Sequence, residues 1–580
     1  MIKILSVFLA FSAAFGLPAQ TRSGGSSSIP DNADFWSEYP HEELADFLLS
    51  RMSDEEKLAQ IYMFGWSGEE PSVLLNRWIS ERGLGSVKVF GWNTNSLENV
   101  ARSVASVQDR AQKHHLKIPL FVATDQEGGM IRHVKGETTV TPGNMAIGAS
   151  QYPVDAYYSA YYISREIKAL GINMNFAPTV DLYTNLDSSV INVRSFGEDA
   201  SLAGQLASAF VAGSIAAGVI PTAKHFPGHG DTSSDSHIKL PGVYIDWEAA
   251  ENRELVPYKY LISQNIPAIM SGHLLYPRID AEPTSLSRNW LVGILREKLG
   301  FNGLIITDDM MMQGAWGYAG NSSKAFEAAI RAGNDIILSS RTAELDEKLW
   351  TMNLDNIRRD PNFRQIVETA ARRVILTKLA YFKSGNSAPL YPEIARLKEQ
   401  IPDKDGQKFF LSQACRSISV YKKGNFPYQK AGGERLLVIG PGDTLPDDNR
   451  PDVHYESPFW QEAKKRYGEN FTFYKIAFEK LGPVGIDWNG NQLEAMAATH
   501  DTIIFYVPNE EGAQIARRLT NCGKRVIILS AFSPVPILNG FGFADTILCG
   551  YSDSVYTFKA FFGALAGEFV PQGKVPLELK

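Results

Sequence analysis

Polar and ionisable side chains crowd into one short stretch of the chain, residues 224–237, with the sequence KHFPGHGDTSSDSH. The stretch holds three His, two Asp and one Lys on a turn that contains Pro227, Gly228 and Gly230. These side chain types bind protons, metal ions or anions, so the crowding indicates a loop with chemistry of its own.

Three interpretations fit this loop. The first is a metal site, because its His and Asp side chains are all possible ligands, although no H-E-x-x-H motif or second cluster accompanies them. The second is a structural loop whose polar groups cap one another. In the third, Asp235 and His237 form a catalytic pair, in which the carboxylate fixes the tautomer of the imidazole and raises its basicity. Since the unperturbed pKa of His is about 6.5, such a pair transfers protons near neutral pH.

A second candidate lies in GLIITDDM, where Asp308 and Asp309 directly follow an apolar run. A carboxylate at the end of a strand serves as a nucleophile, a metal ligand or a helix cap. Capping accounts for one of the two Asp residues but not readily for both. One of them is therefore a candidate partner for the proton-transferring loop.

The elements that must position these residues alternate between helices and short apolar strands. Ser53-Asp54-Glu55-Glu56 is a capping box that opens a helix, and SLAGQLASAFVAG and RNWLVGILREKLG are later helical runs. Seven runs are predicted as strands that end in polar residues: VKVF, LFVATDQ, NMNFAPTVD, PTAKHFPGH, AIMSGH, GLIITDD and DIILSS. In a (β/α)₈ barrel or a doubly wound sheet, active sites form at the carboxyl ends of the parallel strands. The number of units favours the barrel, over residues 36–395.

A second α/β pattern begins near residue 405 and continues to residue 580. RLLVIG, DTIIFYV, KRVIILS and DTILCGY are predicted as strands with helical stretches between them. This alternation predicts a smaller domain, an α/β/α sandwich with helices on both faces of an open sheet. The expected fold class is α/β, a TIM-type barrel followed by the sandwich.

Length and charge narrow the class of protein further. A chain of 580 residues is too long for one hydrophobic core. The net charge of −7, without any basic block, argues against nucleic acid as the main partner. Cys415, Cys522 and Cys549 fit no zinc or redox spacing and are expected to be buried apolar thiols.

The amino-terminal residues resemble a targeting segment. In residues 1–19, Lys3 precedes a short apolar run and Ala19 offers a small residue for cleavage, as in a signal peptide. The run is too short for a permanent membrane helix, and residues 20–35, which include TRSGGSSS, are expected to form a flexible linker. We expect an exported, soluble protein, periplasmic or secreted, with no permanent membrane span.

The loop motif KHFPGHGDTSSDSH resembles the signature of glycoside hydrolase family 3, specifically its β-N-acetylglucosaminidase branch. The resemblance continues through TDQEGG at 124–129, NVRSFGED at 192–199, SGHLLYP at 271–277 and GFNGLIITDDM at 300–310. Near the carboxyl end, GALAGEFVPQGKVPLEL is similar to the close of the family's second domain. The matches run in order along nearly the whole chain after the targeting segment.

This resemblance implies a retaining, exo-acting enzyme that hydrolyses terminal β-linked N-acetylglucosamine through a covalent glycosyl-enzyme intermediate. Asp308 matches the nucleophile, while Asp309 falls where the family accepts other residues. His237 matches the acid/base of this branch, with Asp235 as its partner. Most retaining glycosidases use a second carboxylic acid instead. No metal and no cofactor are implied.

By the same resemblance, Asp125, Arg194, Lys224 and His225 bind the sugar hydroxyls, which need polar or charged partners once buried. His229 is expected to shape the loop by hydrogen bonds.

The chain departs from the family pattern after QEGG. Family members commonly place an Arg four residues after the second Gly, whereas Met130-Ile131-Arg132-His133 follows here. Arg132 comes one position early, and His133 takes the expected place. Arg132 stays a candidate for substrate binding, with a surface or salt-bridged Arg as the alternative.

Other functions remain open. A glycoside phosphorylase is one, because a His base does not repel phosphate as a Glu base would. A non-catalytic cell-wall binding protein is another, but it would have no need for Asp308, Asp235 and His237 together. Family 3 β-glucosidases typically lack the His loop. Muropeptides of peptidoglycan turnover, chito-oligosaccharides and glycan ends all carry a terminal N-acetylglucosamine, and the sequence does not choose among these carbohydrate substrates or set the oligomeric state.

Overall fold

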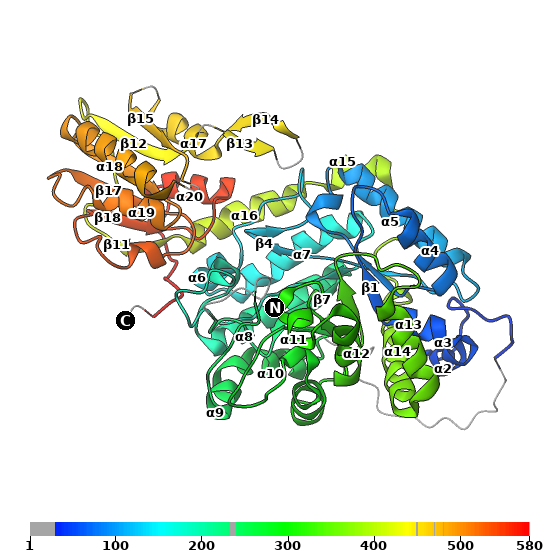
Figure 1. Ribbon diagram of the computed structural model, residues 1–580. Helices are drawn as coiled ribbons and strands as arrows, with labels where there is room; N and C mark the ends of the chain where they lie inside the picture. The colour runs from blue at the N-terminus through cyan, green and yellow to red at the C-terminus, as the bar shows by residue number, and fades with distance from the viewer. Residues whose placement is uncertain are drawn as a thin grey trace.

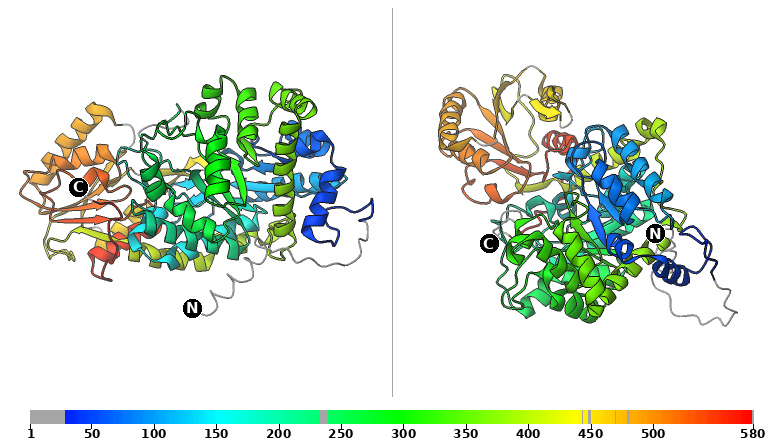
Figure 2. Two further views of the ribbon diagram at one scale, coloured as in Figure 1. Left: turned by 90° about the horizontal axis from the view of Figure 1, so that it is seen from below. Right: turned by 45° about the vertical axis from the view of Figure 1, so that its right-hand side comes forward.

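The structure is a computed structural model that describes residues 29–232, 239–442, 444–447, 450–468, 470–478 and 481–578. The predicted signal peptide, residues 1–19, lies outside the described residues. Figure 1 shows a larger domain, blue to green, and a smaller one, yellow to red, joined by helix α16 (Lys404–Ser417). In both views of Figure 2 the smaller domain stands to one side of the larger one.

The larger domain is an eight-stranded parallel barrel, as predicted. Its strands, in spatial order β10-β1-β2-β3-β6-β7-β8-β9, are β10 (Ile337–Ser339), β1 (Tyr62–Phe64), β2 (Ser86–Lys88), β3 (Phe121–Thr124), β6 (Met174–Asn175), β7 (Ile220–Phe226), β8 (Ala268–Ser271) and β9 (Leu304–Thr307). A single parallel bridge between Ile306 and Ile336 closes the ring from β9 to β10. The sequence analysis missed β1, because three residues between two helices are too few to show a strand pattern.

Alternate residues of the strands fill the barrel interior. Phe121 and Ala123 of β3 pack in one cluster with Met174, Met270 and Ile306 from neighbouring strands. The residues between them face the outer helices instead. The interior is therefore a packed core, and open space for chemistry is left only at the strand ends.

Helices surround the barrel, and the sequence locates several of their ends. The helices that matter below are α2 (His41–Arg51), α3 (Asp54–Gln60), α4 (Val73–Arg82), α5 (Leu97–Lys113), α6 (Asn144–Ser150), α7 (Pro153–Ala169), α8 (Ala200–Ala217) and α10 (Val256–Ser263). The predicted capping box is present at α3, where Ser53 and Glu56 exchange hydrogen bonds. The run RNWLVGILREKLG forms a π-helix, Asn289–Lys298, in place of the expected α-helix.

Helix α8 is the one helix among the described residues that is long and apolar enough to cross a membrane. The sequence analysis expected no such segment. More than half of this helix, 56%, is buried in the protein, and it packs against α7 and α10 on the outside of the barrel. Its apolar composition is that of a core helix.

The smaller domain contains a six-stranded sheet in the order β11-β18-β17-β16-β12-β15. The four predicted strands are β12 (Leu436–Pro441), β16 (Thr502–Val507), β17 (Arg525–Ser530) and β18 (Thr546–Cys549). They run parallel, with β15 (Thr472–Ile476) parallel at one edge and β11 (Ser419–Lys422) antiparallel at the other. All three cysteines are free, but only Cys549 is fully buried; Cys415 and Cys522 are half-buried.

Candidate active site

The carboxyl ends of the barrel strands bring together side chains that are far apart in the sequence. These side chains follow or end β3, β6, β7, β8 and β9, and they belong to Asp125, Asp181, Lys224, His225, His273 and Asp308. Parallel strands in a barrel all point the same way, so their ends meet on one face.

Asp308 directly follows β9, and its backbone N–H donates to the carbonyl oxygen of Ser271 at 2.9 Å. Its Oδ1 accepts from the N–H of Asp309 at 2.8 Å, and its Oδ2 lies 4.0 Å from Nε2 of His225. Burial opposes ionisation, but His225, His273 and the Asp309 N–H outweigh it and hold the pKa of Asp308 at about 2. The side chain is a charged carboxylate at neutral pH that is still 18% exposed, as a nucleophile needs to be.

His225 is oriented by a carboxylate that the sequence analysis did not single out, Asp181. The Nδ1 of His225 lies 2.7 Å from Oδ2 of Asp181, and its backbone N–H donates to both oxygens at 3.2 Å. The N–H of His229 donates to the same carboxylate at 2.7 Å. Asp181 thereby holds a proton on Nδ1 of His225 and turns Nε2 toward Asp308.

Five buried ionised side chains form a network beside Asp308. Lys224 Nζ lies 2.5 Å from Oδ1 of Asp125 and 2.6 Å from Oε1 of Glu127. Lys88 Nζ binds the other oxygen of Asp125 at 2.7 Å. Arg194 donates two hydrogen bonds to Glu127, at 2.8 and 3.0 Å. The network fixes charged donors and acceptors in place, as the binding of sugar hydroxyls requires.

The partners in this network keep one another charged. Burial alone would raise the pKa of both carboxyls, but Lys224 and Lys88 hold the pKa of Asp125 well below its usual range. Arg194 and Lys224 likewise lower the pKa of Glu127 to about 2. Burial would lower the pKa of Lys224, yet the two carboxylates raise it. Lys224, Asp125 and Glu127 therefore stay charged at neutral pH despite their burial.

Three members of the site, Glu127, Lys88 and Asp181, were not predicted from the sequence because their partners lie on other strands. Glu127 lies inside the quoted TDQEGG, but its partners come from distant strands. Lys88 is a charged residue in the apolar run VKVF, and Asp181 closes NMNFAPTVD. A lone charge within a buried strand was the available signal, since such a group needs a partner.

Arg132 and His133 take different places. Arg132 ends β5 (Ile131–Arg132), and its Nη1 donates to the carbonyl and hydroxyl oxygens of Thr138 at 3.0 and 3.1 Å. His133 Nδ1 lies 3.5 Å from Oδ2 of Asp125, and burial lowers its pKa to about 4. His133 therefore adjoins the sugar-binding network as a neutral imidazole, while Nη1 of Arg132 turns to Thr138.

Two of the three predicted catalytic residues, Asp235 and His237, lie outside the described residues. The start of their loop is described. His229 is buried there, its Nδ1 lies 2.8 Å from Oγ1 of Thr232, and burial lowers its pKa to about 4. The structure thus places His229 inside the turn, where hydrogen bonds hold it.

Asp309 faces away from this chemistry. Its Oδ1 accepts from the N–H of Met311 at 3.0 Å and from the N–H of Ser340 at 2.9 Å. Its carbonyl oxygen lies 3.0 Å from Nε2 of His273. Asp309 therefore caps the turn after β9, and Asp308 is left to face His225.

The smaller domain stands apart from these groups. Among the described residues, no hydrogen bond or ion pair joins one of its side chains to Asp125, Lys224, His225 or Asp308.

A glycosyl hydrolase family model and several beta-hexosaminidases are similar to this chain in sequence. The family model described as glycosyl hydrolase family 3 N terminal domain matches residues 53–375. Beta-hexosaminidase A of Pseudoalteromonas piscicida is 34% identical over 394 residues, which cover 63% of this chain and 62% of that protein. A beta-hexosaminidase of Tolumonas auensis is 37% identical over 250 residues, or 43% of this chain and 72% of that protein. The chain spans less than two thirds of the first relative and more than two thirds of the second.

Solved structures agree with this relation. A glycoside hydrolase family 3 beta-N-acetylglucosaminidase from Paenibacillus sp. str. FPU-7 has a TM-score of 0.79 and 27% identity, over 91% of this chain and 99% of that one. The beta-glucoside phosphorylase BglX is similar in fold alone, with a TM-score of 0.76 and 21% identity, over 93% and 96% of the two chains. The family model covers more than half of the 580 residues and includes every strand end that carries the site, so the chain belongs to glycosyl hydrolase family 3.

Proposed function

We propose that this protein is a retaining, exo-acting β-N-acetylglucosaminidase of the β-hexosaminidase type. The observation that carries the proposal is the placement of Asp308, an ionised and partly exposed carboxylate 4.0 Å from His225 and beside the buried network around Lys224. The similarity to beta-hexosaminidases in sequence and to a beta-N-acetylglucosaminidase in structure supports the same activity.

In the proposed first step, a carboxylate oxygen of Asp308 attacks the anomeric carbon of the terminal sugar. The bond to the leaving oxygen breaks as His237 donates a proton to it, which leaves a glycosyl ester on Asp308. In the second step, water attacks the same carbon and gives its proton to His237, and Asp308 is released. Asp235 orients His237, and two displacements retain the β configuration.

The network explains how the terminal sugar is held. Asp125 and Glu127 accept hydrogen bonds from sugar hydroxyls, while Lys224, Arg194 and His225 donate to them or orient them. Peptidoglycan fragments and chito-oligosaccharides both offer the required terminal N-acetylglucosamine. We place the protein outside the cytoplasm, in the periplasm or secreted, on the basis of the signal-peptide pattern in residues 1–19.

The test is to incubate the protein with an aryl β-N-acetylglucosaminide, with and without inorganic phosphate, and to identify the sugar product. We expect free N-acetylglucosamine under both conditions and little turnover of the matching β-glucoside. Sugar 1-phosphate that forms only with phosphate would instead identify a phosphorylase. No product under either condition would identify a binding protein, and the Asp308→Ala variant controls for contaminating activity.

A further inference from the structure

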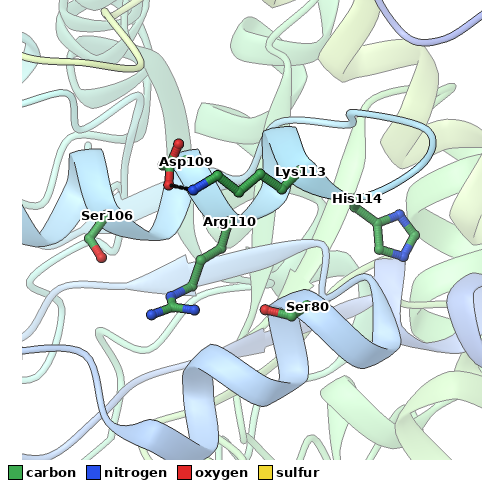
Figure 3. Close-up of a pocket in the computed structure, with 6 residues that line it drawn as sticks. All are labelled: Ser80, Ser106, Asp109, Arg110, Lys113 and His114. Atoms are coloured by element: carbon green, nitrogen blue, oxygen red, sulfur yellow. Dashed lines mark hydrogen bonds and ion pairs between the residues drawn. The ribbon is translucent and has the colours of Figure 1, made fainter.

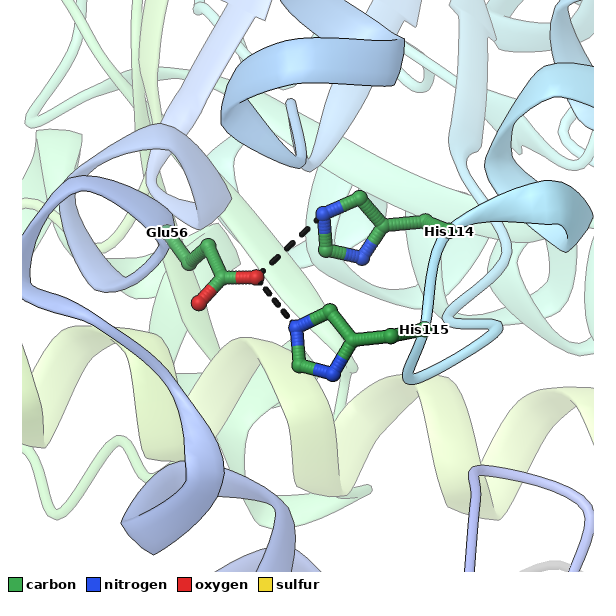
Figure 4. Close-up of side chains that lie close together, drawn as sticks. All are labelled: Glu56, His114 and His115. Atoms are coloured by element: carbon green, nitrogen blue, oxygen red, sulfur yellow. Dashed lines mark hydrogen bonds and ion pairs between the residues drawn. The ribbon is translucent and has the colours of Figure 1, made fainter.

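Three possible metal ligands converge on the opposite end of the barrel from Asp308. Glu56 lies in the first turn of α3, and His114 and His115 directly follow α5. Oε1 of Glu56 lies 3.2 Å from Nε2 of His114 and 2.5 Å from Nε2 of His115, as Figure 4 shows. All three ligand atoms lie within 4.8 Å of one another. No residue of this triad belongs to the proposed glycosidase site.

The donor set and its spacing match zinc. Two imidazole nitrogens and one carboxylate oxygen, completed by water, form a common tetrahedral zinc site. Ligand atoms at about 2.0–2.1 Å from a tetrahedral ion lie roughly 3.3 Å from one another. The distance between Oε1 of Glu56 and Nε2 of His114, 3.2 Å, already matches this spacing. The Glu56–His115 distance of 2.5 Å must open, and His115 is free to move because its side chain is 55% exposed.

Glu56 is held in position before any ion binds. Its Oε2 accepts a hydrogen bond from the backbone N–H of Ser53 at 2.7 Å, and its own N–H donates to the Ser53 hydroxyl at 3.2 Å. The capping box therefore fixes the carboxylate and leaves Oε1 turned toward the two imidazoles. Such outer hydrogen bonds orient the ligands of metal sites.

The local charges also suit a divalent cation. Three positively charged side chains near the triad pair with carboxylates: Lys57 with Glu368, Arg82 with Glu55, and Lys113 with Asp109. Arg110, which lines the same hollow as His114, is a further cation there.

The triad can be reached from the surface. A hollow of about 190 Å³ lies between α4 and α5 and ends at His114, as Figure 3 shows. It is lined by Ser80, Ser106, Asp109, Arg110, Lys113 and His114.

We propose that Glu56, His114 and His115 form a zinc-binding site that ties the start of α3 to the end of α5. These elements lead into β1 and β3, so the site lies at the amino ends of the strands. Residues on that face of a barrel serve stability rather than catalysis. The resemblance to family 3 implied no metal. In the sequence, Glu56 and the two His residues are separated by β1, α4, β2 and α5, and they meet only in the folded chain.

The test uses the full-length protein, stripped with EDTA, dialysed and titrated with zinc chloride by calorimetry. We expect one zinc ion to bind at this site and to raise the melting temperature by a few degrees, because a ligand that binds only the folded state stabilises it. His115→Ala removes a ligand and should weaken this binding by at least about 100-fold, because the loss of a residue that only orients a ligand already costs about 10–100-fold. His41→Ala, which removes an exposed His from α2, is the matched control and should bind as the wild type does.

Zinc on the histidines of the catalytic loop would behave differently. It would persist in His115→Ala and would inhibit hydrolysis of an aryl substrate, whereas zinc at the triad should leave the turnover rate unchanged. Cobalt(II) supplies an independent readout, since a tetrahedral site gives a strong visible spectrum that His115→Ala should abolish. Identical zinc titrations of the wild type and His115→Ala, or no binding to the wild type, would overturn the proposal and leave the triad a hydrogen-bonded contact.

Discussion

The charge of Asp308 decides how the pH dependence of turnover should be interpreted. With a pKa of about 2, this carboxyl loses its proton far below neutral pH. Any group that limits turnover between about pH 5 and pH 8 must then be another one, and an imidazole, with an ordinary pKa of about 6.5, is the side chain that titrates there. We expect this group to be His237.

Asp308→Ala should lower turnover of an aryl β-N-acetylglucosaminide by roughly 10⁴-fold or more at every pH, because no other described group can form the glycosyl ester. Asp309→Ala removes the acceptor for two backbone N–H groups, so it should cost about 1–2 kcal/mol of stability and keep measurable activity. Steady-state rates and thermal unfolding of both variants are the measurement. A fluorinated sugar that labels Asp309 or a Glu would contradict the assignment.

His237→Gly should affect substrates unequally. A natural disaccharide has a poor leaving group that needs a proton, so its rate should fall by about 10²–10⁴-fold. An activated aryl group leaves without help, so glycosyl–Asp308 should still form and accumulate. The measurement is the rate with both substrates, with and without azide. Azide needs no base, so it should restore turnover of the aryl substrate.

Asp235→Ala is the companion variant and should show a weaker form of the same defect, because it leaves the imidazole in place but unoriented. Equal losses on both substrates without rescue by azide would mean that the loop binds sugar and that the acid/base lies elsewhere.

At the scale of elements, the start of the catalytic loop is held by the π-helix that follows it, Ala250–Glu254, and by the segment after β8. Tyr276 donates its hydroxyl to the carbonyl oxygen of Gly228 at 2.6 Å, and Arg253 Nη2 lies 2.5 Å from Oδ2 of Asp231. Gly228 has φ +148°, and a Cβ there would come within 2.5 Å of Oε2 of Glu254. Glu254 is buried, its Oε1 accepts from Arg253 at 2.7 Å, and its Oε2 has no hydrogen-bond partner among the described residues.

Glu254 predicts a pH-dependent stability. Burial raises its pKa to about 7, despite the attraction of Arg253. Between its unfolded value of about 4.5 and pH 7, the folded state keeps a proton that the unfolded state releases, so the free energy of unfolding falls as pH rises through this window. The total fall in the free energy of unfolding across this window should be up to about 3 kcal/mol. In Glu254→Gln this fall should be absent, as denaturant titrations at pH 4.5 and pH 7.5 will measure; parallel changes in both proteins would contradict the assignment.

At the scale of the whole molecule, the smaller domain contacts the barrel segment that carries Arg194. Its carboxyl-terminal tail reaches the barrel, where the N–H of Lys574 donates to the Ala149 carbonyl oxygen at 2.9 Å. Ala149 belongs to α6, whose first residue, Asn144, donates to the carbonyl oxygen of Arg194 at 2.8 Å. Val193 also packs in the hydrophobic cluster of the smaller domain. Through these contacts the smaller domain holds the backbone of Arg194 in place.

Removing residues 573–580 should lower kcat/KM for the aryl substrate by roughly 10–100-fold, because small displacements of binding groups are costly in catalysis. Most of the change should be in KM, since Arg194 binds the sugar and does not react. Removing residues 579–580 alone is the control and should have no effect.

Substitutions of acidic residues in the smaller domain should leave hydrolysis of the aryl substrate near normal. A single substitution that abolished turnover in a folded protein would show that this domain carries a catalytic group.

The sequence alone determined the features that depend on neighbours along the chain. Alternating strands and helices predicted the α/β class, the barrel and four strands of the smaller domain, and a local hydrogen-bonding pattern predicted the cap at Ser53. The motifs that resemble family 3 led to the family and to Asp308, Lys224 and Arg194. These features were predictable because strand periodicity, capping and motif spacing are all local.

Only the tertiary structure decided which distant side chains meet. The single bridge between Ile306 and Ile336 closes the barrel and makes its strand ends converge. The strand order sets β2 beside β3 and β6 beside β7, which pairs Lys88 with Asp125 and Asp181 with His225. At the other end, the starts of β1 and β3 bring Glu56 to the two His residues. The physical reason is that a buried charge needs a partner, but sequence does not say which strand will lie beside it in the folded barrel.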